Sequence, residues 1–329
     1  QLWNTKLDLG YGLDKRDDRD GAFPGDATTK RYSFSWQNDL HWADNQLLIT
    51  GVDYSNEEIK GSTEFKEDQR YNAGVFAQNT STFSGSDLQL GLRRDKNEAY
   101  GYNNTGNASW GFDLPASMRL IASYGTAFRA PTFYDLYGPF GANPDLKAET
   151  SENSELELRG SHAGVRWSVN IFQNNMDDML LYTAGKMQNV DKARIRGVEL
   201  TAATELSGWN IHSNLSLLDP ENRSGSNKGK VLQRRAKELF VLDAQRRYGR
   251  LSVGGTFRAQ GTSYNDTANK EKVAGFGTLD LRFGYEMTSE LKTELKIVNL
   301  MDKEYATTDG YRDTPRSGFV TLIWTPASL

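Results

Sequence analysis

Apolar and polar side chains alternate along most of this chain, and that alternation limits what the chain can fold into. In the segment 118–125, Met118, Leu120, Ala122 and Tyr124 take every second position. A period of two is that of a β-strand with one apolar and one polar face. The pattern recurs in about sixteen segments separated by turn signals. The sequence therefore predicts an all-β, antiparallel protein.

The polar face carries charged residues in nearly every segment. In 279–286, for example, Asp280, Arg282 and Glu286 alternate with leucine and aromatic residues. A soluble sandwich would pack this face against a second sheet, whereas a transmembrane barrel turns its apolar face to lipid and its polar face to a wet lumen. In hydrocarbon every backbone N–H and C=O needs a partner, so such a sheet must close. We therefore expect an antiparallel transmembrane β-barrel.

Connections between the segments support the same prediction, because short turns and long polar loops follow one another. We expect eight long connections: 15–29, 55–70, 95–104, 128–152, 175–191, 219–234, 262–273 and 303–315. Tight turns at one end and long loops at the other are typical of outer-membrane barrels. Several aromatic residues stand near the short turns, as an interfacial girdle requires. They are Trp42, Phe83, Trp209, Tyr248 and Tyr285.

Composition excludes several other classes of protein. The chain has 329 residues, no cysteine and a net charge of −4. The absence of cysteine excludes a disulfide-stapled fold, and the lack of a basic stripe argues against a nucleic-acid partner. The sequence shows no catalytic motif, no zinc spacing and no 18-residue apolar run, so we predict no enzyme activity, no cofactor and no transmembrane helix. An acidic stretch, Asp14–Asp26, lacks the spacing of a calcium loop, which favours a solvated loop.

The connection 128–152 is the strongest candidate for ligand recognition. It is rich in aromatic residues, prolines and glycines, and long loops are where β-proteins commonly place recognition. Phe133, Tyr134, Tyr137 and Phe140 would offer a large contact area at small entropic cost. A purely structural interpretation remains open, in which Arg129 braces the loop and the prolines fix its turns.

Three stretches together resemble the C-terminal part of TonB-dependent outer-membrane receptors. They are Tyr124–Pro131 with Asn143–Thr150, then Asn189–Leu200, and finally Val298–Ala306 with Gly310–Tyr311 and Pro315–Phe319. The resemblance implies a 22-stranded barrel with a plug in its lumen. Residues 1–329 would then be the C-terminal portion of that barrel, with roughly six strands and the plug lying outside the chain.

Among these receptors, the chain looks most like the vitamin B12 (cobalamin) transporters. The resemblance implies location in the outer membrane of a Gram-negative bacterium, contact with outer-membrane lipid and lipopolysaccharide, and coupling to TonB through the plug. We expect the small-molecule ligand to be cobalamin, with a ferric siderophore as the alternative. A passive sixteen-stranded porin and a structural or adhesive barrel are the other readings. The expected ligand-binding residues are Arg129, Phe133, Tyr134, Tyr137, Phe140, Asn143 and Tyr311.

Overall fold

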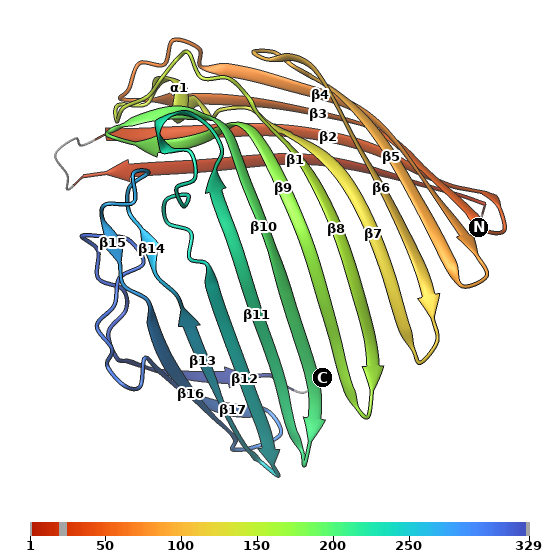
Figure 1. Ribbon diagram of the computed structural model, residues 1–329, viewed down its shortest axis with the longest axis vertical. Helices are drawn as coiled ribbons and strands as arrows, with labels where there is room; N and C mark the ends of the chain where they lie inside the picture. Colours follow the sequence, from red (N-terminus) through yellow and green to blue (C-terminus); the bar gives the residue numbers. More distant parts are fainter. Residues whose placement is uncertain (1, 20–24, 327–329) are drawn as a thin grey trace. The chain divides into compact units, whose positions relative to one another are not determined.

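The computed structural model describes residues 2–19 and 25–326, which are mostly β-strand (Figure 1). The long strands of the first half are β1 (Trp3–Asp18), β2 (Gly25–Ala43), β3 (Gln46–Gly61), β4 (Gln69–Phe83), β5 (Ser86–Asn97), β6 (Gly101–Leu114), β7 (Met118–Arg129) and β8 (Glu149–His162). The second half contains β9 (Val165–Thr183), β10 (Lys186–Leu206), β11 (Trp209–Asn222), β12 (Glu238–Tyr248), β13 (Leu251–Gln260), β14 (Ser263–Tyr264), β15 (Lys272–Val273), β16 (Phe276–Glu286), β17 (Leu291–Val298) and β18 (Ser317–Trp324). Two short helical elements, α1 (Phe133–Tyr137) and the 3₁₀ turn η1 (Gly225–Asn227), lie in connections.

Sixteen of these strands form one sheet in which each strand neighbours the next one along the chain. Among the strands of the described residues, β14 and β15 form a separate two-stranded sheet in the connection between β13 and β16. The registers between the long strands are antiparallel, for example Leu9 opposite Phe34 and Leu242 opposite Phe257. The predicted antiparallel, all-β fold of about sixteen strands is confirmed. Within the described residues, no helix combines the length and the apolar character needed to cross a bilayer.

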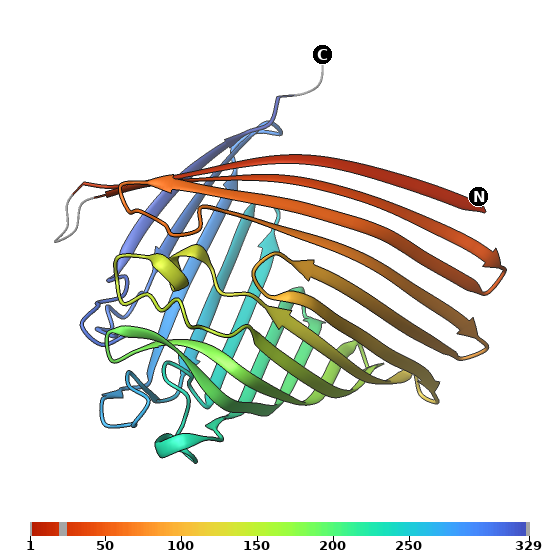
Figure 2. The ribbon, with the colours of Figure 1, turned by 90° about the horizontal axis from the view of Figure 1, so that it is seen from above.

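The chain divides into two compact units. The first contains Gln1–Asp113, Ile121–Glu155 and Asn174–Ala193, and the second contains Leu114–Leu120, Leu156–Gln173 and Arg194–Leu329. Within the first unit, β1 to β5 run side by side as long hairpins (Figure 2). Within the second, β11, β12, β13, β16, β17 and β18 do the same.

The strand registers place apolar residues beside apolar residues and polar residues beside polar ones. In the first unit, Leu9 lies opposite Phe34, and Phe34 opposite Tyr54. One position along, Asp8 lies opposite Ser35, and Ser35 opposite Asp53. Because partners across a ladder point to the same side of a sheet, the alternation in the sequence becomes two continuous faces.

The apolar face of the sheet is solvent-accessible. Leu9 is 77% exposed and Leu92 75% exposed, although both are large aliphatic residues. The most buried apolar side chains instead gather near the connections, as Ile59, Phe133 and Leu136 do in the first unit and Leu232 does in the second. An exposed apolar surface of this extent marks a contact with lipid or protein rather than with water.

Several of the short turns are built from two residues with positive φ. Ala163–Gly164 and Ser207–Gly208 both show this conformation, which suits a two-residue hairpin. Ala184–Gly185 does so as well, and it joins β9 directly to β10. The prediction of a long loop over 175–191 is therefore wrong. The predicted loop over 95–104 is likewise mostly strand, with a three-residue turn between Asn97 and Gly101.

The acidic stretch Asp14–Asp26 is also more ordered than a solvated loop. Asp14, Asp17 and Asp18 belong to β1 and Asp26 to β2, while Asp20 lies outside the described residues. Among the residues that the structure describes, no group of three or more acidic or histidine residues is arranged to hold a metal ion.

Candidate ligand-binding loop and polar-face cavity

The connection between β7 and β8, residues 130–148, is a folded element and is called here the β7–β8 loop. It begins with a capping box, in which Thr132 Oγ1 accepts a hydrogen bond from the Asp135 backbone N–H at 3.2 Å and Asp135 Oδ2 accepts one from the Thr132 N–H at 2.8 Å. Such reciprocal bonds satisfy N–H groups that the start of a helix leaves unpaired. They allow α1 to form even though it contains only five residues.

A small apolar core fixes α1 against the rest of the loop and against β9. Leu136, Leu146 and Leu180 form a buried cluster, and Tyr137 and Met187 pack on it. Leu180 belongs to β9 and Met187 to β10, so the hairpin 174–193 supplies one wall of this core. Burial of a leucine side chain stabilises a fold by about 1.5–3 kcal/mol, which is enough to order a short loop.

Polar contacts join the same loop to the β9–β10 hairpin through backbone atoms. Asn189 Oδ1 accepts a hydrogen bond from the Lys147 N–H at 2.9 Å, and Asn189 Nδ2 donates to the Lys147 carbonyl at 3.1 Å and to the Asp178 carbonyl at 2.6 Å. Asn143 Nδ2 donates to the Met187 carbonyl at 3.2 Å. Glu149 Oε2 accepts from the Leu180 N–H at 2.9 Å. The β9–β10 hairpin therefore holds the second half of the β7–β8 loop in place through hydrogen bonds.

The first half of the loop is held by residues from β1, β4 and the connection between β3 and β4. Arg70 Nη1 donates to the Pro131 carbonyl at 2.7 Å, and the Arg70 guanidinium lies 4.9 Å from the centre of the Phe133 ring. Tyr134 and Phe65 form a T-shaped pair with ring centres 5.6 Å apart, and the Arg16 guanidinium lies 6.0 Å from the centre of the Tyr134 ring. Figure 1 shows α1 at the end of β2, β3 and β4 where the connection between β3 and β4 lies.

A further contact comes from the turn between β5 and β6. The hydroxyl of Tyr100 donates to the Leu146 carbonyl at 3.1 Å. Burial raises the pKa of the Tyr100 phenol above its ordinary value, and the neighbouring Arg70 partly opposes this shift. The neutral, donating form of Tyr100 is therefore the one that fits this position.

The structure gives different surroundings to the seven residues that the sequence analysis selected. Phe133 is buried, Tyr137 packs on the leucine cluster, and Asn143 is bonded to Met187. Arg129 is exposed and lies 3.9 Å from Glu149, and Phe140 is 48% exposed. Six of the seven thus lie in or beside one ordered loop. The seventh, Tyr311, is 75% exposed in the connection between β17 and β18 of the second unit.

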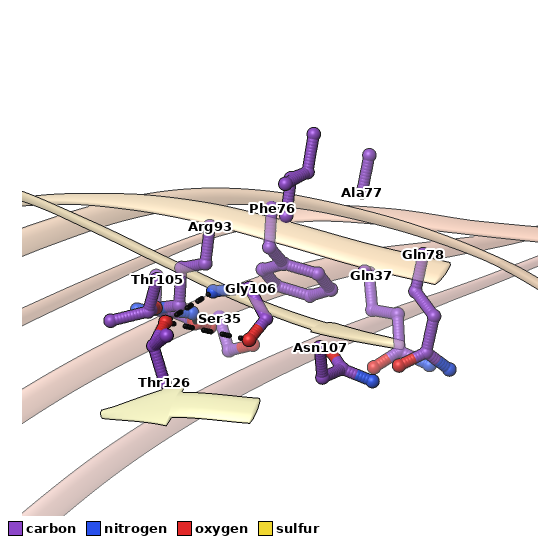
Figure 3. Close-up of a pocket in the computed structure, with 13 residues that line it drawn as sticks. Ser35, Gln37, Phe76, Ala77, Gln78, Arg93, Thr105, Gly106, Asn107 and Thr126 are labelled. Atoms are coloured by element: carbon purple, nitrogen blue, oxygen red, sulfur yellow. Dashed lines mark hydrogen bonds and ion pairs between the residues drawn. The ribbon is translucent and has the colours of Figure 1, made fainter. Parts of the chain in front are cut away.

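The polar face of the first unit contains a cavity of about 410 Å³ (Figure 3). Its lining combines amide, hydroxyl and charged side chains with one aromatic ring. The lining side chains include those of Ser35, Gln37, Asp53, Phe76, Gln78, Arg93 and Asn107. The sequence analysis predicted a polar face for these strands but did not identify this group of residues. The one sequence signal for the group is the alternation of side chains along each strand.

Arg93 organises the charge in this cavity. Its guanidinium donates to Asp53 at 2.6 Å and, through two nitrogens, to Asp95 at 2.7 and 2.8 Å. It also lies 5.7 Å from the Phe76 ring centre. The ring in turn occupies space above Gly51, where an added Cβ would stand 2.6 Å from Phe76 Cζ. The arrangement keeps an aromatic ring and a cluster of one cation and two carboxylates against the polar face.

The second unit repeats this pairing of charges on its polar face. Arg282 donates to Asp243 at 2.6 Å and to Thr256 Oγ1 at 2.6 Å, and Arg258 pairs with Asp280 at 2.8 Å. Asp280 also accepts a hydrogen bond from the backbone N–H of Asn299 at 2.9 Å. Paired charges of this kind suit a face that meets water or polar protein and not hydrocarbon.

A single antiparallel sheet with one exposed apolar face and one charged face defines the class of transmembrane β-barrel proteins. Comparison with known proteins is more specific. The family model described as "TonB dependent receptor-like, beta-barrel" matches residues 1–300, so the chain belongs to the TonB-dependent receptor β-barrel family.

A vitamin B12 transporter from Photobacterium profundum is 30% identical to this chain over 339 residues, covering 98% of the chain and 55% of the transporter. Among solved structures, a ferric enterobactin receptor from Pseudomonas aeruginosa matches with a TM-score of 0.79 at 19% identity, covering 98% of this chain and 59% of the receptor. A siderophore receptor from Acinetobacter baumannii matches with a TM-score of 0.79 at 17% identity, covering 97% of this chain and 60% of the receptor. The chain thus spans little more than half the length of these relatives. The family is one of receptors and transporters, which are not enzymes.

Proposed function

We propose that this chain is the C-terminal part of the barrel of an outer-membrane receptor that imports vitamin B12 in a TonB-dependent manner. The observation that carries the proposal is the β7–β8 loop, which is fixed from two sides and leaves Phe140 and Arg129 accessible. A loop ordered before binding loses little entropy when a ligand docks. The 30% identity with a B12 transporter supports cobalamin as the ligand.

In this proposal the accessible residues contact the ligand and the buried ones hold the loop in place. Phe140 and Arg129 belong to the first group, and Tyr311 on the second unit is the third candidate. The other four, Phe133, Tyr134, Tyr137 and Asn143, have contacts within the protein, so they act through the position of the loop. Coupling to TonB passes through a plug domain that lies outside residues 1–329.

The experiment is binding of radiolabelled cyanocobalamin to cells that display the full-length receptor. We expect Phe140→Ala to weaken binding by about five- to thirtyfold, because an aromatic contact at a binding site contributes about 1–2 kcal/mol. Phe83→Ala is the matched control, since Phe83 is an equally exposed aromatic residue at the end of β4 and not on the loop. Unchanged binding in Phe140→Ala would remove this side chain from the site.

Competition separates the candidate ligands. An excess of a ferric catecholate siderophore that displaces cobalamin, or that binds when cobalamin does not, would favour the siderophore alternative. Planar-bilayer conductance tests the passive porin, which would conduct ions without TonB. The receptor proposed here predicts saturable binding and, with the plug in place, little steady conductance.

A further inference from the structure

The polar-face cavity of the first unit is hollow because glycines form part of its floor. Gly51, Gly74 and Gly91 stand on the polar faces of β3, β4 and β5, and each has a larger side chain folded over it. An added Cβ at Gly51 would stand 2.6 Å from Phe76 Cζ, and one at Gly91 would overlap Asn107 Oδ1. Because the glycines leave this room, the two side chains lie flat along the sheet and a cavity remains above them.

The lining side chains form two neighbouring rows across the strands. In the first row, Phe76 on β4 lies opposite Arg93 on β5. In the second row, Gln78 on β4 and Asn107 on β6 flank Gly91 from its two sides. Figure 3 shows the Phe76 ring and both amide side chains on the same side of these strands. The rows therefore place an aromatic ring beside a pair of carboxamide groups.

The charged group at the edge of this cavity is already satisfied by contacts within the protein. Arg93 Nη1 donates to Asp53, and Arg93 Nε and Nη2 donate to Asp95. Two carboxylates thus surround one guanidinium, which leaves one negative charge in excess. This charge would repel an anionic ligand. The cavity therefore favours a ligand without net negative charge.

The amide side chains of the cavity keep hydrogen-bonding capacity for a ligand. Gln78 Oε1 accepts a hydrogen bond from Gln89 Nε2 at 3.1 Å. Gln37 Nε2 donates to Asp39 Oδ1 at 2.8 Å. Since a carboxamide has two donor hydrogens and an acceptor oxygen, Gln78 Nε2 can still donate to a ligand and Gln37 Oε1 can still accept from one. The amide of Asn107, which is exposed, offers both kinds of group. Such a lining suits a ligand whose own groups donate and accept, as a primary carboxamide does.

The cavity lies away from the β7–β8 loop, along a strand that contacts it. Arg70 on β4 binds this loop at the Pro131 carbonyl, and Phe76 follows six residues later on the same strand. At about 3.3 Å per residue, this spacing corresponds to roughly 20 Å. β4 continues beyond the cavity to Phe83. A ligand that moves from the loop along the polar face toward the short turns would therefore meet the cavity on its way.

We propose that this cavity is a second, transient binding site for the imported ligand, and that it binds the primary carboxamide arms of a corrinoid. The corrin ring of cobalamin carries such arms around its rim. Gln78 and Asn107 would bind one arm, while the Phe76 ring contacts the apolar edge of the macrocycle. The volume of about 410 Å³ is near the lower end of the range for ligand pockets, about 300–1,000 Å³, so it accommodates one edge of the ring. The inference rests on the proposed function.

The test is photo-crosslinking of radiolabelled cyanocobalamin to the full-length receptor in energised cells. Asn107→p-benzoylphenylalanine places the photoreactive group in the cavity, and Asn104→p-benzoylphenylalanine places it on the opposite face of the same strand. We expect light to transfer radiolabel to the first variant and not to the second. Adding Gln78→Leu to the first variant should lower its labelling by about fivefold, as the loss of one neutral hydrogen bond predicts. Gln245→Leu is the matched control, because it removes an exposed amide from the polar face of the second unit, and it should leave the labelling unchanged.

Binding of cobalamin to the same cells, measured without light, shows that each variant is folded and displayed. Binding without radiolabel on the Asn107 variant, equal labelling of the Asn104 variant, or labelling that Gln78→Leu does not lower would overturn the inference and leave the proposed function standing. A crosslink to the receptor's own polypeptide alone would also overturn it, because a segment of the plug would then occupy the cavity. If wild type binds no cobalamin, the proposed function fails and this inference fails with it. Thr105→p-benzoylphenylalanine probes the same cavity if the Asn107 variant is not displayed.

Discussion

Asn189 offers the sharpest test of how the β7–β8 loop is held. Its amide group makes three hydrogen bonds to backbone atoms, two with Lys147 and one with Asp178. Asn189→Ala removes all three. A typical intramolecular hydrogen bond contributes about 0.5–1.5 kcal/mol net, and water can reach this half-buried position to replace part of the loss. The free energy of opening this part of the loop should therefore fall by about 2–3 kcal/mol.

Hydrogen–deuterium exchange measures this opening at the Lys147 amide, whose acceptor in the folded loop is Asn189 Oδ1. Because 1.4 kcal/mol corresponds to a factor of ten, the protection of this amide should fall by about 30- to 150-fold. Asn189→Asp keeps the acceptor for the Lys147 N–H but loses both donors. It should therefore lie between wild type and Asn189→Ala.

The control for Asn189→Ala is Asn104→Ala, an exposed asparagine on β6 of the same unit. It should leave the Lys147 amide unchanged. If Asn189→Ala leaves that amide as protected as in wild type, the loop is held by its leucine cluster and the role assigned to Asn189 is wrong.

Three further perturbations test other parts of the structure. Leu136→Ala should lower the free energy of unfolding by about 2–3 kcal/mol in urea titrations of the micellar protein, because it removes a buried member of a small core. Arg93→Gln leaves Asp53 and Asp95 without their shared cation at a partly exposed site, and the same titration should show a loss of about 1–2 kcal/mol. Backbone N–H donors, that of Glu271 first, lower the pKa of Asp266. Its stabilising effect is thus present above the ordinary aspartate pKa and is lost as the pH falls through the lowered value. Exchange at the Lys270 and Glu271 amides should accordingly rise only below about pH 4, and Asp266→Asn should flatten this dependence.

The sequence was sufficient to predict the sheet where lipid and water impose different chemistry on its two faces. In β5, Leu88, Leu90 and Leu92 alternate with polar residues, and this pattern is sufficient to identify a strand and its orientation. The alternation disappears where a strand extends beyond the lipid and both of its faces meet water. In β9, residues 173–178 are almost all polar, so period-two reasoning predicts a loop there although the strand continues to Thr183. The Ala184–Gly185 turn was the missed signal.

The candidate site was less predictable, for a different physical reason. An aromatic residue in a long loop can either pack or bind, and composition does not separate the two. Phe133 and Phe140 lie in the same loop, yet the first is buried and the second is exposed. The residues that hold the loop in place, Arg70, Leu180 and Asn189, are distant from it in the sequence. Their contribution arises from strand register and cannot be found in the loop's own residues.

The contacts that hold the β7–β8 loop end largely on its main chain. Arg70 binds the Pro131 carbonyl, Tyr100 binds the Leu146 carbonyl, and Asn189 binds both polar backbone atoms of Lys147. Bonds to backbone atoms specify the path of a loop without specifying its side chains. Exposed positions such as Phe140 can consequently change while the path is kept. We infer that this scaffold separates the residues that order the loop from those that select the ligand, so substitutions in the first group should alter binding only together with loop exchange.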